Sequence, residues 1–255
     1  MRVLALDSSG LVASVAVVEG KEGNADACTI AEYTVNYKKT HSQTLLPMID
    51  EVVNMLGIEL DSVDAIAVSG GPGSFTGLRI GSATAKGLGF AMKKPLVQVP
   101  TVDAMAYNLF GSDLLICPIM DARRNQVYTG LYRCKEDLEV VKAQCAMDMG
   151  ELVRELDERG ETVVFLGDGV PVYRPLIGEM MKTPHLFAPA HMNRQRAGAV
   201  AALGAKYLAE GKVVTAEEFK PDYLRKEREA AEKELEAAER EWEEAERKRE
   251  EERRR

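Results

Sequence analysis

A carboxylate, two hydroxyls and a glycine follow the first apolar run of the chain, in the order Asp7-Ser8-Ser9-Gly10. The amides and hydroxyls of such a turn can hold a phosphate, and its Asp can bind a metal ion or a water molecule. The same residue types are common in ordinary polar hairpin turns. These four residues therefore favour a hairpin turn, with nucleotide binding as the alternative interpretation.

Residues 70–81 form the most specific segment of the chain, Gly-Gly-Pro-Gly-Ser-Phe-Thr-Gly-Leu-Arg-Ile-Gly. It is not a P-loop, because no Lys-Ser or Lys-Thr pair follows the glycines. Small residues recur at every fourth position and would form one narrow stripe on a helix: Gly73, Gly77, Gly81, Ala85 and Gly89. Because each glycine costs about 1 kcal/mol relative to alanine inside a helix, the stripe predicts close packing against another backbone. Anion binding at the start of the helix is the less favoured alternative.

The other reactive side chains do not form a recognisable catalytic or metal-binding pattern. The histidines are too scattered for a metal site by spacing: His41, His185 and His191. No serine stands in a G-x-S-x-G context, so a hydrolase nucleophile is not supported. Residues 121–128 (Asp-Ala-Arg-Arg-Asn-Gln-Val-Tyr) favour a turn that is closed by a salt bridge.

These motifs fall at the ends of apolar runs that alternate with amphipathic segments. Strands are predicted at residues 3–6, 11–18, 28–35, 65–69, 96–99, 114–120, 126–132 and 162–166. Helices are predicted at residues 41–56, 74–92, 149–159 and 196–210. A strand hairpin opens each half of the chain, so we expect a duplicated α/β architecture. The predicted domains are residues 1–103 and 104–220, followed by a charged helical tail over 221–255.

The first predicted helix is apolar over more of its surface than packing on one side requires. One stripe at helical spacing contains Leu45, Ile49, Val52 and Leu56. Further apolar residues lie outside this stripe: Leu46, Met48, Val53 and Met55. Two interpretations are about equally supported. The helix is buried within its own domain, or one side of it packs on a partner protein.

The composition excludes several classes of protein. The chain has 255 residues and a formal net charge of −8, which argues against a protein that grips nucleic acid by itself. No apolar stretch approaches the roughly 20 residues of a membrane span. The first residues contain no cleavable leader, so a cytoplasmic protein is expected. The four cysteines have no CxxC spacing and are predicted to be reduced, partly buried thiols: Cys28, Cys117, Cys134 and Cys145.

Residues 226–255 consist almost wholly of Glu, Arg, Lys and Ala. Glu to Lys or Arg pairs four residues apart recur along them, and each adds about 0.2–0.5 kcal/mol to an isolated helix. Only Leu235 and Trp242 are large and apolar. This composition favours a single solvated helix, with weak self-pairing through Trp242 as the alternative.

Taken together, the motifs resemble those of the TsaB family. The resemblance rests on residues 3–9, 41–47 (His-Ser-Gln-Thr-Leu-Leu-Pro), 69–81, 121–124 (Asp-Ala-Arg-Arg) and 221–225 (Pro-Asp-Tyr-Leu-Arg). It covers residues 1–225 and leaves the tail outside. It implies two tandem α/β domains of the actin-like ATPase, or ribonuclease H-like, fold. It also implies a role in making threonylcarbamoyladenosine at position 37 of tRNA.

The resemblance further implies a subunit without catalytic residues, cofactor or metal. The catalytic paralogue, TsaD, holds a metal with two histidines four residues apart. The corresponding residues 100–106 of this chain contain no histidine and one carboxylate, Asp103. The nearest candidate for the paralogue's glycine-rich nucleotide loop is Gly167-Asp168-Gly169.

The resemblance also implies the partners. The chain is expected to pair with a TsaD-like subunit through two helices of its N-terminal domain, to work with a TsaE-like ATPase and to meet tRNA only within the complex. A homodimer through the same surface is a further expectation. The expected interface residues are Leu45, Leu46, Ile49, Val53, Gly73, Gly77, Leu78, Gly81 and Ala85. The alternatives are a stand-alone nucleotide hydrolase or peptidase of actin-like fold and a nucleotide-sensing module.

Overall fold

The computed structural model describes residues 1–20, 27–37 and 40–224. Residues Met1–Asp222 form one compact unit. The tail predicted from residue 226 onward, with its charge pairs and Trp242, lies outside the described residues.

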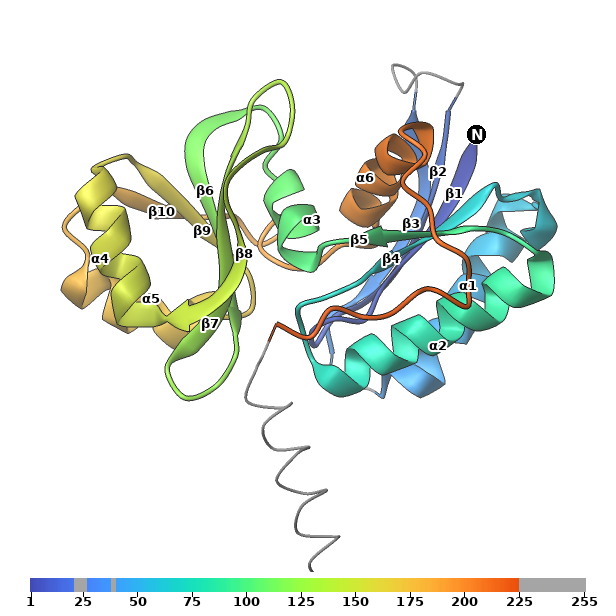
Figure 1. Cartoon of the computed structure of the whole chain (residues 1–255), viewed down its shortest axis with the longest axis horizontal. Helices are drawn as coiled ribbons and strands as arrows, with labels where there is room; N and C mark the ends of the chain where they lie inside the picture. Colours follow the sequence, from blue (N-terminus) through green and yellow to red (C-terminus); the bar gives the residue numbers. More distant parts are fainter. Residues whose placement is uncertain (21–26, 38–39, 225–255) are drawn as a thin grey trace, which may run out of the picture. The chain divides into compact units, whose positions relative to one another are not determined.

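The first half of the chain forms a five-stranded sheet (Figure 1). Its strands are β1 (Arg2–Asp7), β2 (Ala13–Glu19), β3 (Cys28–Val35), β4 (Ala65–Ser69) and β5 (Leu96–Val99), in the spatial order β3-β2-β1-β4-β5. β1, β2 and β3 are antiparallel neighbours, whereas β4 and β5 extend the sheet in parallel to β1. β1 and β4 are buried along nearly their whole length, which is why their sequences are continuously apolar.

Two helices cover one face of this sheet and pack side by side, α1 (His41–Leu56) and α2 (Phe75–Met92) (Figure 1). α1 ends at Gly57, which has a φ of 61° and closes the helix as its sequence predicts. A short 3-10 helix (Leu60–Ser62) leads from α1 to β4. The inner side of α1 is buried against the sheet through Leu45, Met48, Ile49 and Val52.

The second half repeats the topology of the first. Its strands are β6 (Ser112–Asp121), β7 (Gln126–Cys134), β8 (Glu139–Asp148), β9 (Val163–Leu166) and β10 (His185–Phe187), in the order β10-β9-β6-β7-β8. Its helices are α4 (Met149–Arg159) and α5 (Val170–Met180). Written from the opposite edge, the second sheet has the order β8-β7-β6-β9-β10, which matches β3-β2-β1-β4-β5 strand by strand. The pairs of neighbouring strands also run in the same relative directions in both sheets. The expected duplication is confirmed.

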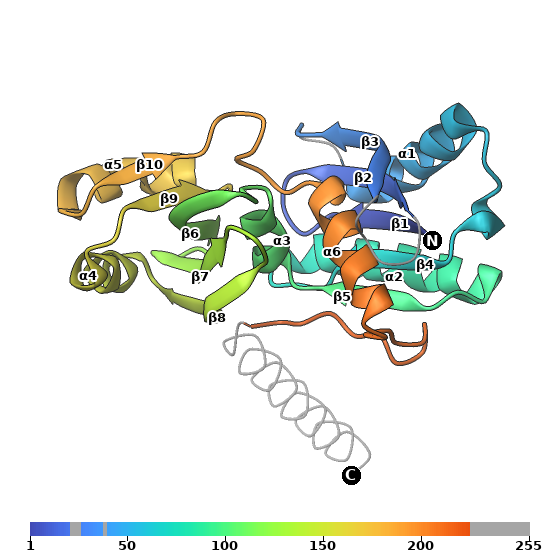
Figure 2. The same ribbon diagram turned by 90° about the horizontal axis from the view of Figure 1, so that it is seen from above.

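The last helix of each half packs on the sheet of the other half (Figures 1 and 2). α3 (Thr101–Tyr107) lies against β6 and β7, and α6 (Ala197–Ala209) lies against β1, β2 and β4. α6 approaches so closely that a Cβ on Gly204 would stand 2.5 Å from the Cβ of Ala67. The predicted domain ranges 1–103 and 104–220 divide the chain by sequence position. In the structure, α6 lies within the second range but packs on the first sheet.

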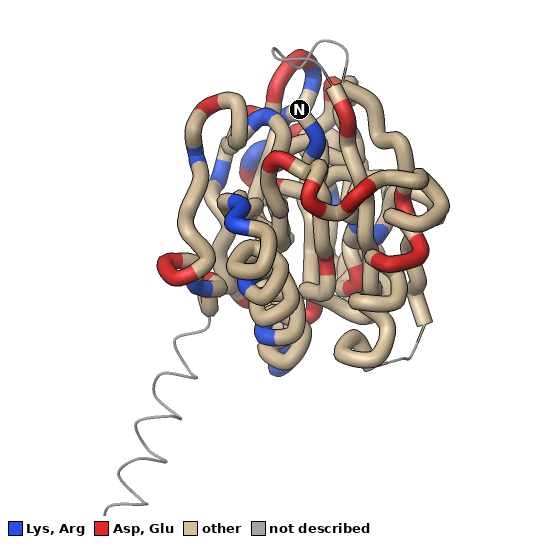
Figure 3. Tube along the Cα trace, turned by 90° about the vertical axis from the view of Figure 1, so that its right-hand side faces the viewer, with Lys and Arg blue, Asp and Glu red and all other residues tan. Residues whose placement is uncertain are grey.

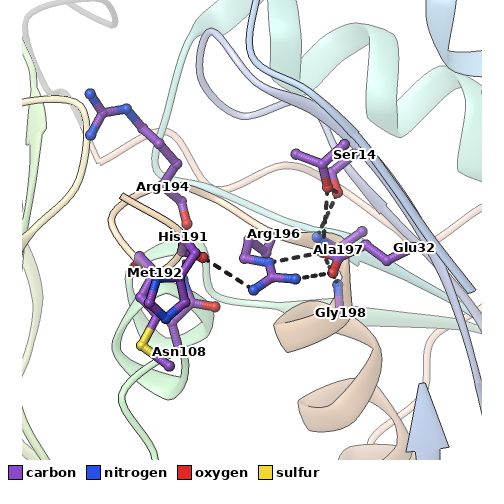
Figure 4. A network of polar contacts seen from close by, with 10 residues as sticks. Ser14, Glu32, Asn108, His191, Met192, Arg194, Arg196, Ala197 and Gly198 are labelled. Atoms are coloured by element: carbon purple, nitrogen blue, oxygen red, sulfur yellow. Dashed lines mark hydrogen bonds and ion pairs between the residues drawn. The ribbon is translucent and has the colours of Figure 1, made fainter. Parts of the chain in front are cut away.

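A carboxylate from the first sheet fixes the start of α6 (Figure 4). Glu32 accepts hydrogen bonds from Arg196 Nε at 3.2 Å and from the backbone N of Gly198 at 3.1 Å. The backbone N of Ala197 donates to Ser14 Oγ at 2.9 Å. The carboxylate thus occupies the helix end where backbone N–H groups lack partners inside the helix.

We expect Glu32→Ala to lower the free energy of unfolding by about 2–3 kcal/mol, because it removes both the helix cap and the ion pair with Arg196. Urea denaturation followed by circular dichroism measures the change. Asp113→Ala is the control, because that carboxylate is 72% exposed in its ion pair with Lys135 and should change stability by less than about 0.5 kcal/mol. Equal effects of the two substitutions would contradict the anchoring role of Glu32.

The described part of the chain contains no helix that is long and apolar enough to cross a membrane. All four cysteines are free thiols in the structure, as expected. Cys117 and Cys134 are buried, Cys145 is partly buried and Cys28 is exposed.

Candidate functional site

The glycine-rich segment joins β4 to α2 and lies on the β1–β2 turn. Ser74 caps α2, and its Oγ accepts a hydrogen bond from the backbone N of Gly77 at 3.3 Å. The backbone N of Ser74 donates to the carbonyl O of Ser9 at 2.6 Å. The start of α2 is therefore bonded to the turn whose residue types could hold a phosphate.

The glycines of this segment let α2 touch the turn directly. An added Cβ would stand 2.3 Å from Ser9 O at Gly73, 2.0 Å from Ser8 O at Gly77 and 2.5 Å from Ser8 Oγ at Gly81. Real Cβ atoms do not approach other atoms so closely. The near atom is a backbone oxygen at Gly73 and Gly77, so only glycine fits there, whereas at Gly81 it is a side-chain hydroxyl. The prediction of close packing against another backbone is confirmed, and that backbone is the chain's own turn.

The carboxylate of Asp7 is enclosed by this contact. It is 1% exposed, and its Oδ1 accepts hydrogen bonds from Ser9 N at 2.9 Å and Ser9 Oγ at 2.7 Å. Its Oδ2 accepts from Ser69 Oγ at 2.6 Å. Burial raises the pKa of Asp7, and the hydrogen bonds from Ser69 and Ser9 oppose that shift. The hairpin-turn interpretation is confirmed, because this turn joins the antiparallel neighbours β1 and β2.

Ser8 closes the turn from the other side. Its Oγ donates to the carbonyl O of Gly77 at 2.9 Å. The hydroxyl that could reach a phosphate therefore binds α2 instead. Within the described ranges no group of three or more His, Cys, Asp or Glu side chains could hold a metal ion.

The second half has an equivalent turn between β6 and β7, and it contains the predicted salt bridge. Asp121 Oδ2 lies 3.3 Å from Arg123 Nη1, and Asp121 Oδ1 accepts a hydrogen bond from the backbone N of Arg123 at 3.0 Å. Arg123, Arg124 and Asn125 have φ values of 68°, 53° and 59°, so the turn is tight and left-handed.

The candidate nucleotide loop, Gly167-Asp168-Gly169, packs on the end of β6. Gly167 has a φ of 111°, and a Cβ there would stand 2.1 Å from Ile119 O. The backbone N of Gly169 donates to the same carbonyl at 3.0 Å. Burial raises the pKa of Asp168 to about 6, and its Oδ1 has no hydrogen-bond partner among the described residues.

Asp103 lies in residues 100–106, which correspond by resemblance to the segment with the metal-binding histidines in the catalytic paralogue. In this structure its carboxylate is bonded to a buried tyrosine. Tyr132 Oη donates to Asp103 Oδ1 at 2.7 Å, which ties α3 to β7. Tyr132 is fully buried and Asp103 is 9% exposed. Burial raises the pKa of Asp103, and the bond from Tyr132 opposes that shift.

We expect Tyr132→Phe to lower the free energy of unfolding by about 1–3 kcal/mol, because the buried Asp103 would lose its hydrogen-bond donor. Thermal and urea denaturation measure the effect. Tyr33→Phe serves as the control, because that side chain is 42% exposed. A Tyr132 variant as stable as the control would rule out a structural role for this bond.

The structure places most of the expected interface residues inside the domain. Leu45, Ile49 and Leu78 are 1%, 3% and 2% exposed. The other buried members are Gly77, Gly81 and Ala85. These six residues belong to faces that pack on the sheet and on the Asp7 turn. Leu46 is 55% exposed, while Val53 and Gly73 are partly exposed.

The opposite side of α2 is exposed, and the interface residues expected from the sequence do not include it. We define the outer face of α2 by its exposed residues at helical spacing: Thr76, Arg79, Ala83, Gly87 and Phe90. Phe90 is 53% exposed, and an added Cβ on Gly87 would meet nothing within 4 Å. Ala83 and Gly87 form a second small-residue series, two positions away from the buried one. That offset was the signal in the sequence that could have revealed the face.

Known proteins share both the sequence and the fold of this chain. Residues 29–233 match the family model described as TsaD, tRNA N6-adenosine threonylcarbamoyltransferase. The tRNA threonylcarbamoyladenosine biosynthesis protein TsaB of Bacillus subtilis is 33% identical over 227 residues, which cover 88% of this chain and 94% of the relative. The protein of the same name from Escherichia coli is 29% identical over 238 residues, which cover 88% and 95%.

A solved structure agrees with these relatives. YeaZ from Pseudomonas aeruginosa superposes with a TM-score of 0.71 at 26% identity, over 88% of this chain and 99% of that protein. The shared fold is the duplicated α/β architecture described above. The chain therefore belongs to the TsaB family, within the wider group of proteins that match the TsaD family model.

Proposed function

We propose that this protein is a non-catalytic subunit for tRNA threonylcarbamoyladenosine biosynthesis, which binds and activates a TsaD-type catalytic subunit in the cytoplasm. One arrangement carries the proposal. α2 closes the Asp7 turn with its inner glycines and leaves its outer face exposed. In this proposal the inner side of α2 packs on the turn that could otherwise bind a phosphate, and its outer side is the docking surface.

The enclosure of Asp7 supports the absence of catalysis. A carboxylate that binds a metal or activates a water needs a free oxygen directed at the ligand. Here Ser9 donates to one oxygen and Ser69 to the other, and the Ser8 hydroxyl donates to the backbone of α2.

The outer face of α2 supports docking. An exposed glycine inside a helix costs about 1 kcal/mol relative to alanine. Among the described residues no neighbouring element compensates this cost at Gly87, since an added Cβ would meet nothing within 4 Å outside its own helix backbone. A partner helix that crosses at Ala83 and Gly87 would compensate it, and Phe90 supplies an aromatic anchor of the type that dominates interfaces.

These observations revise the expected interface. Leu46 and Val53 on α1 and Gly73 before α2 stay in it, and the outer face of α2 replaces the buried residues. The buried six support the surface from beneath. We further propose that the same face forms a homodimer when the catalytic partner is absent, and that a TsaE-like ATPase joins the complex.

The charge distribution supports a role in which tRNA is met only through the complex. The net charge is −8, and Figure 3 shows both acidic and basic positions along the part of the Cα trace that faces the viewer. Phosphate backbones bind to concentrated positive charge. This protein would therefore rely on its partner for contact with tRNA.

Three measurements test the proposal. Sedimentation of the full chain with the TsaD protein of the same organism should give a complex, and threonylcarbamoyl transfer to tRNA should require both proteins. Calorimetry with ATP and Mg²⁺ should give no heat for this chain alone. Micromolar ATP binding that Asp7→Ala abolishes would instead support the alternative of a stand-alone nucleotide hydrolase.

A further inference from the structure

Arg79 is the one charged residue of the outer face of α2. It lies one turn after Phe75 on the same helix, and its guanidinium carbon is 3.8 Å from the centroid of the Phe75 ring. This stacking holds the flat guanidinium group against the helix surface. An exposed arginine without such support would sample many rotamers and lose more entropy on binding.

Arg79 has no acidic partner within the described part of the chain. Among the described residues, the Arg79 side chain interacts only with the Phe75 ring, on which it stacks. The other cation in the middle of α2 is already used, because Lys86 Nζ donates to Glu217 O at 3.4 Å and to Phe219 O at 3.2 Å. The outer face therefore presents a single ordered positive charge between small side chains.

The surroundings of Arg79 suit a helix that approaches closely. Thr76 and Ala83 flank it along the outer face, and Gly87 lies two turns further on. A partner helix seated on Ala83 and Gly87 would bring its own side chains within reach of the guanidinium group. The N–H groups of a guanidinium match the two oxygens of a carboxylate, and such paired hydrogen bonds are stronger than neutral ones.

We propose that Arg79, held in place by the Phe75 ring, pairs with a carboxylate on the docking helix of the catalytic partner. The inference rests on the proposed function, because it concerns the same surface. The Arg79–carboxylate pair would be the charged contact by which this surface selects its partner. A partner helix with small residues and one Asp or Glu at the matching position fits the face, whereas one with Lys or Arg there is repelled.

Calorimetric titration of the full chain with the TsaD protein tests this pairing. We expect Arg79→Gln to weaken binding about tenfold or more, and Arg79→Glu to weaken it further. Arg79→Lys should restore part of the loss, because lysine keeps the charge and lacks the planar pair of donors. Binding by the wild type should fall more steeply with salt than binding by Arg79→Gln.

A matched control is Arg154→Gln on α4, another exposed arginine on a helix that packs on the other sheet. It should bind the partner as the wild type does, and both variants should melt within about 2 °C of it. In the partner, replacing each Asp or Glu of its docking helices by the amide should identify one position whose loss is not additive with Arg79→Gln.

The outcomes separate the two proposals. Unchanged affinity of Arg79→Gln, together with lost binding of a Gly87 variant, would overturn the pairing and leave the docking surface in place. Failure of the wild-type chain to bind the TsaD protein would overturn both.

Discussion

Gly77→Ala is expected to lower the free energy of unfolding by at least about 3 kcal/mol, whereas Gly87→Ala on the same helix should raise it by about 0.5–1 kcal/mol. At Gly77 the new Cβ would stand 2.0 Å from the backbone O of Ser8, and a backbone atom cannot yield as a flexible side chain does. At Gly87 the new Cβ meets nothing within 4 Å, so only the better helix propensity of alanine counts. Urea denaturation of both variants measures the two changes.

The pair is informative because the substitution, the helix and the residue types are identical. Opposite signs would establish that the inner side of α2 is fixed by contact with the Asp7 turn. A Gly77 variant as stable as the wild type would mean that α2 can move off the turn. In that case the enclosure of Asp7 would no longer argue against phosphate binding.

The second large effect concerns binding. We expect Gly87→Leu to weaken binding to the TsaD protein by about a hundredfold or more, because its side chain fills the space that a partner backbone would occupy. The free energy of unfolding should not fall below that of the wild type, since leucine is the better helix former and the position is open. Analytical ultracentrifugation and calorimetric titration measure binding, and denaturation measures stability.

Gly178→Leu is the matched control for this experiment. Gly178 lies on α5 of the second half, is exposed and likewise has nothing within 4 Å of an added Cβ. It should gain the same helix propensity and keep full binding. If the two leucine variants bound the partner equally well, the outer face of α2 would not be the docking surface.

The two proposals together explain why α2 is rich in glycine on more than one side. The inner series allows contact with Ser8 and Ser9, and Gly87 belongs to the exposed series. Helix propensity alone disfavours every one of these glycines. The Asp7 turn is the close neighbour of the inner series, and the proposed partner helix would be the neighbour of Gly87.

Much of the fold could be predicted from the sequence, because long apolar runs and clear end signals identify their own elements. The predicted bounds of β3, β4, β5, α1 and α4 coincide with those of the structure. β8, α3, α5 and β10 were not predicted. β8 is only partly buried along its length, so its apolar pattern is weak. α5 contains Pro171 and Pro175, and α3 and β10 are short.

Part of the candidate site could likewise be predicted from the sequence, and part of it could not. The amino-acid sequence is enough to predict the duplicated α/β class, the two N-terminal helices and the glycine stripe that requires a close neighbour, because these follow from local periodicity. It also determined the absence of a histidine pair in residues 100–106.

The segment that contacts the stripe, and the side of α2 that is exposed, become known only from the folded chain. Ser8 and Gly77 are 69 positions apart, and no local pattern specifies their contact. The exchange of α3 and α6 between the sheets likewise depends on packing between distant segments. The physical reason is that periodicity defines the faces of a helix, while burial of one face depends on elements elsewhere in the chain.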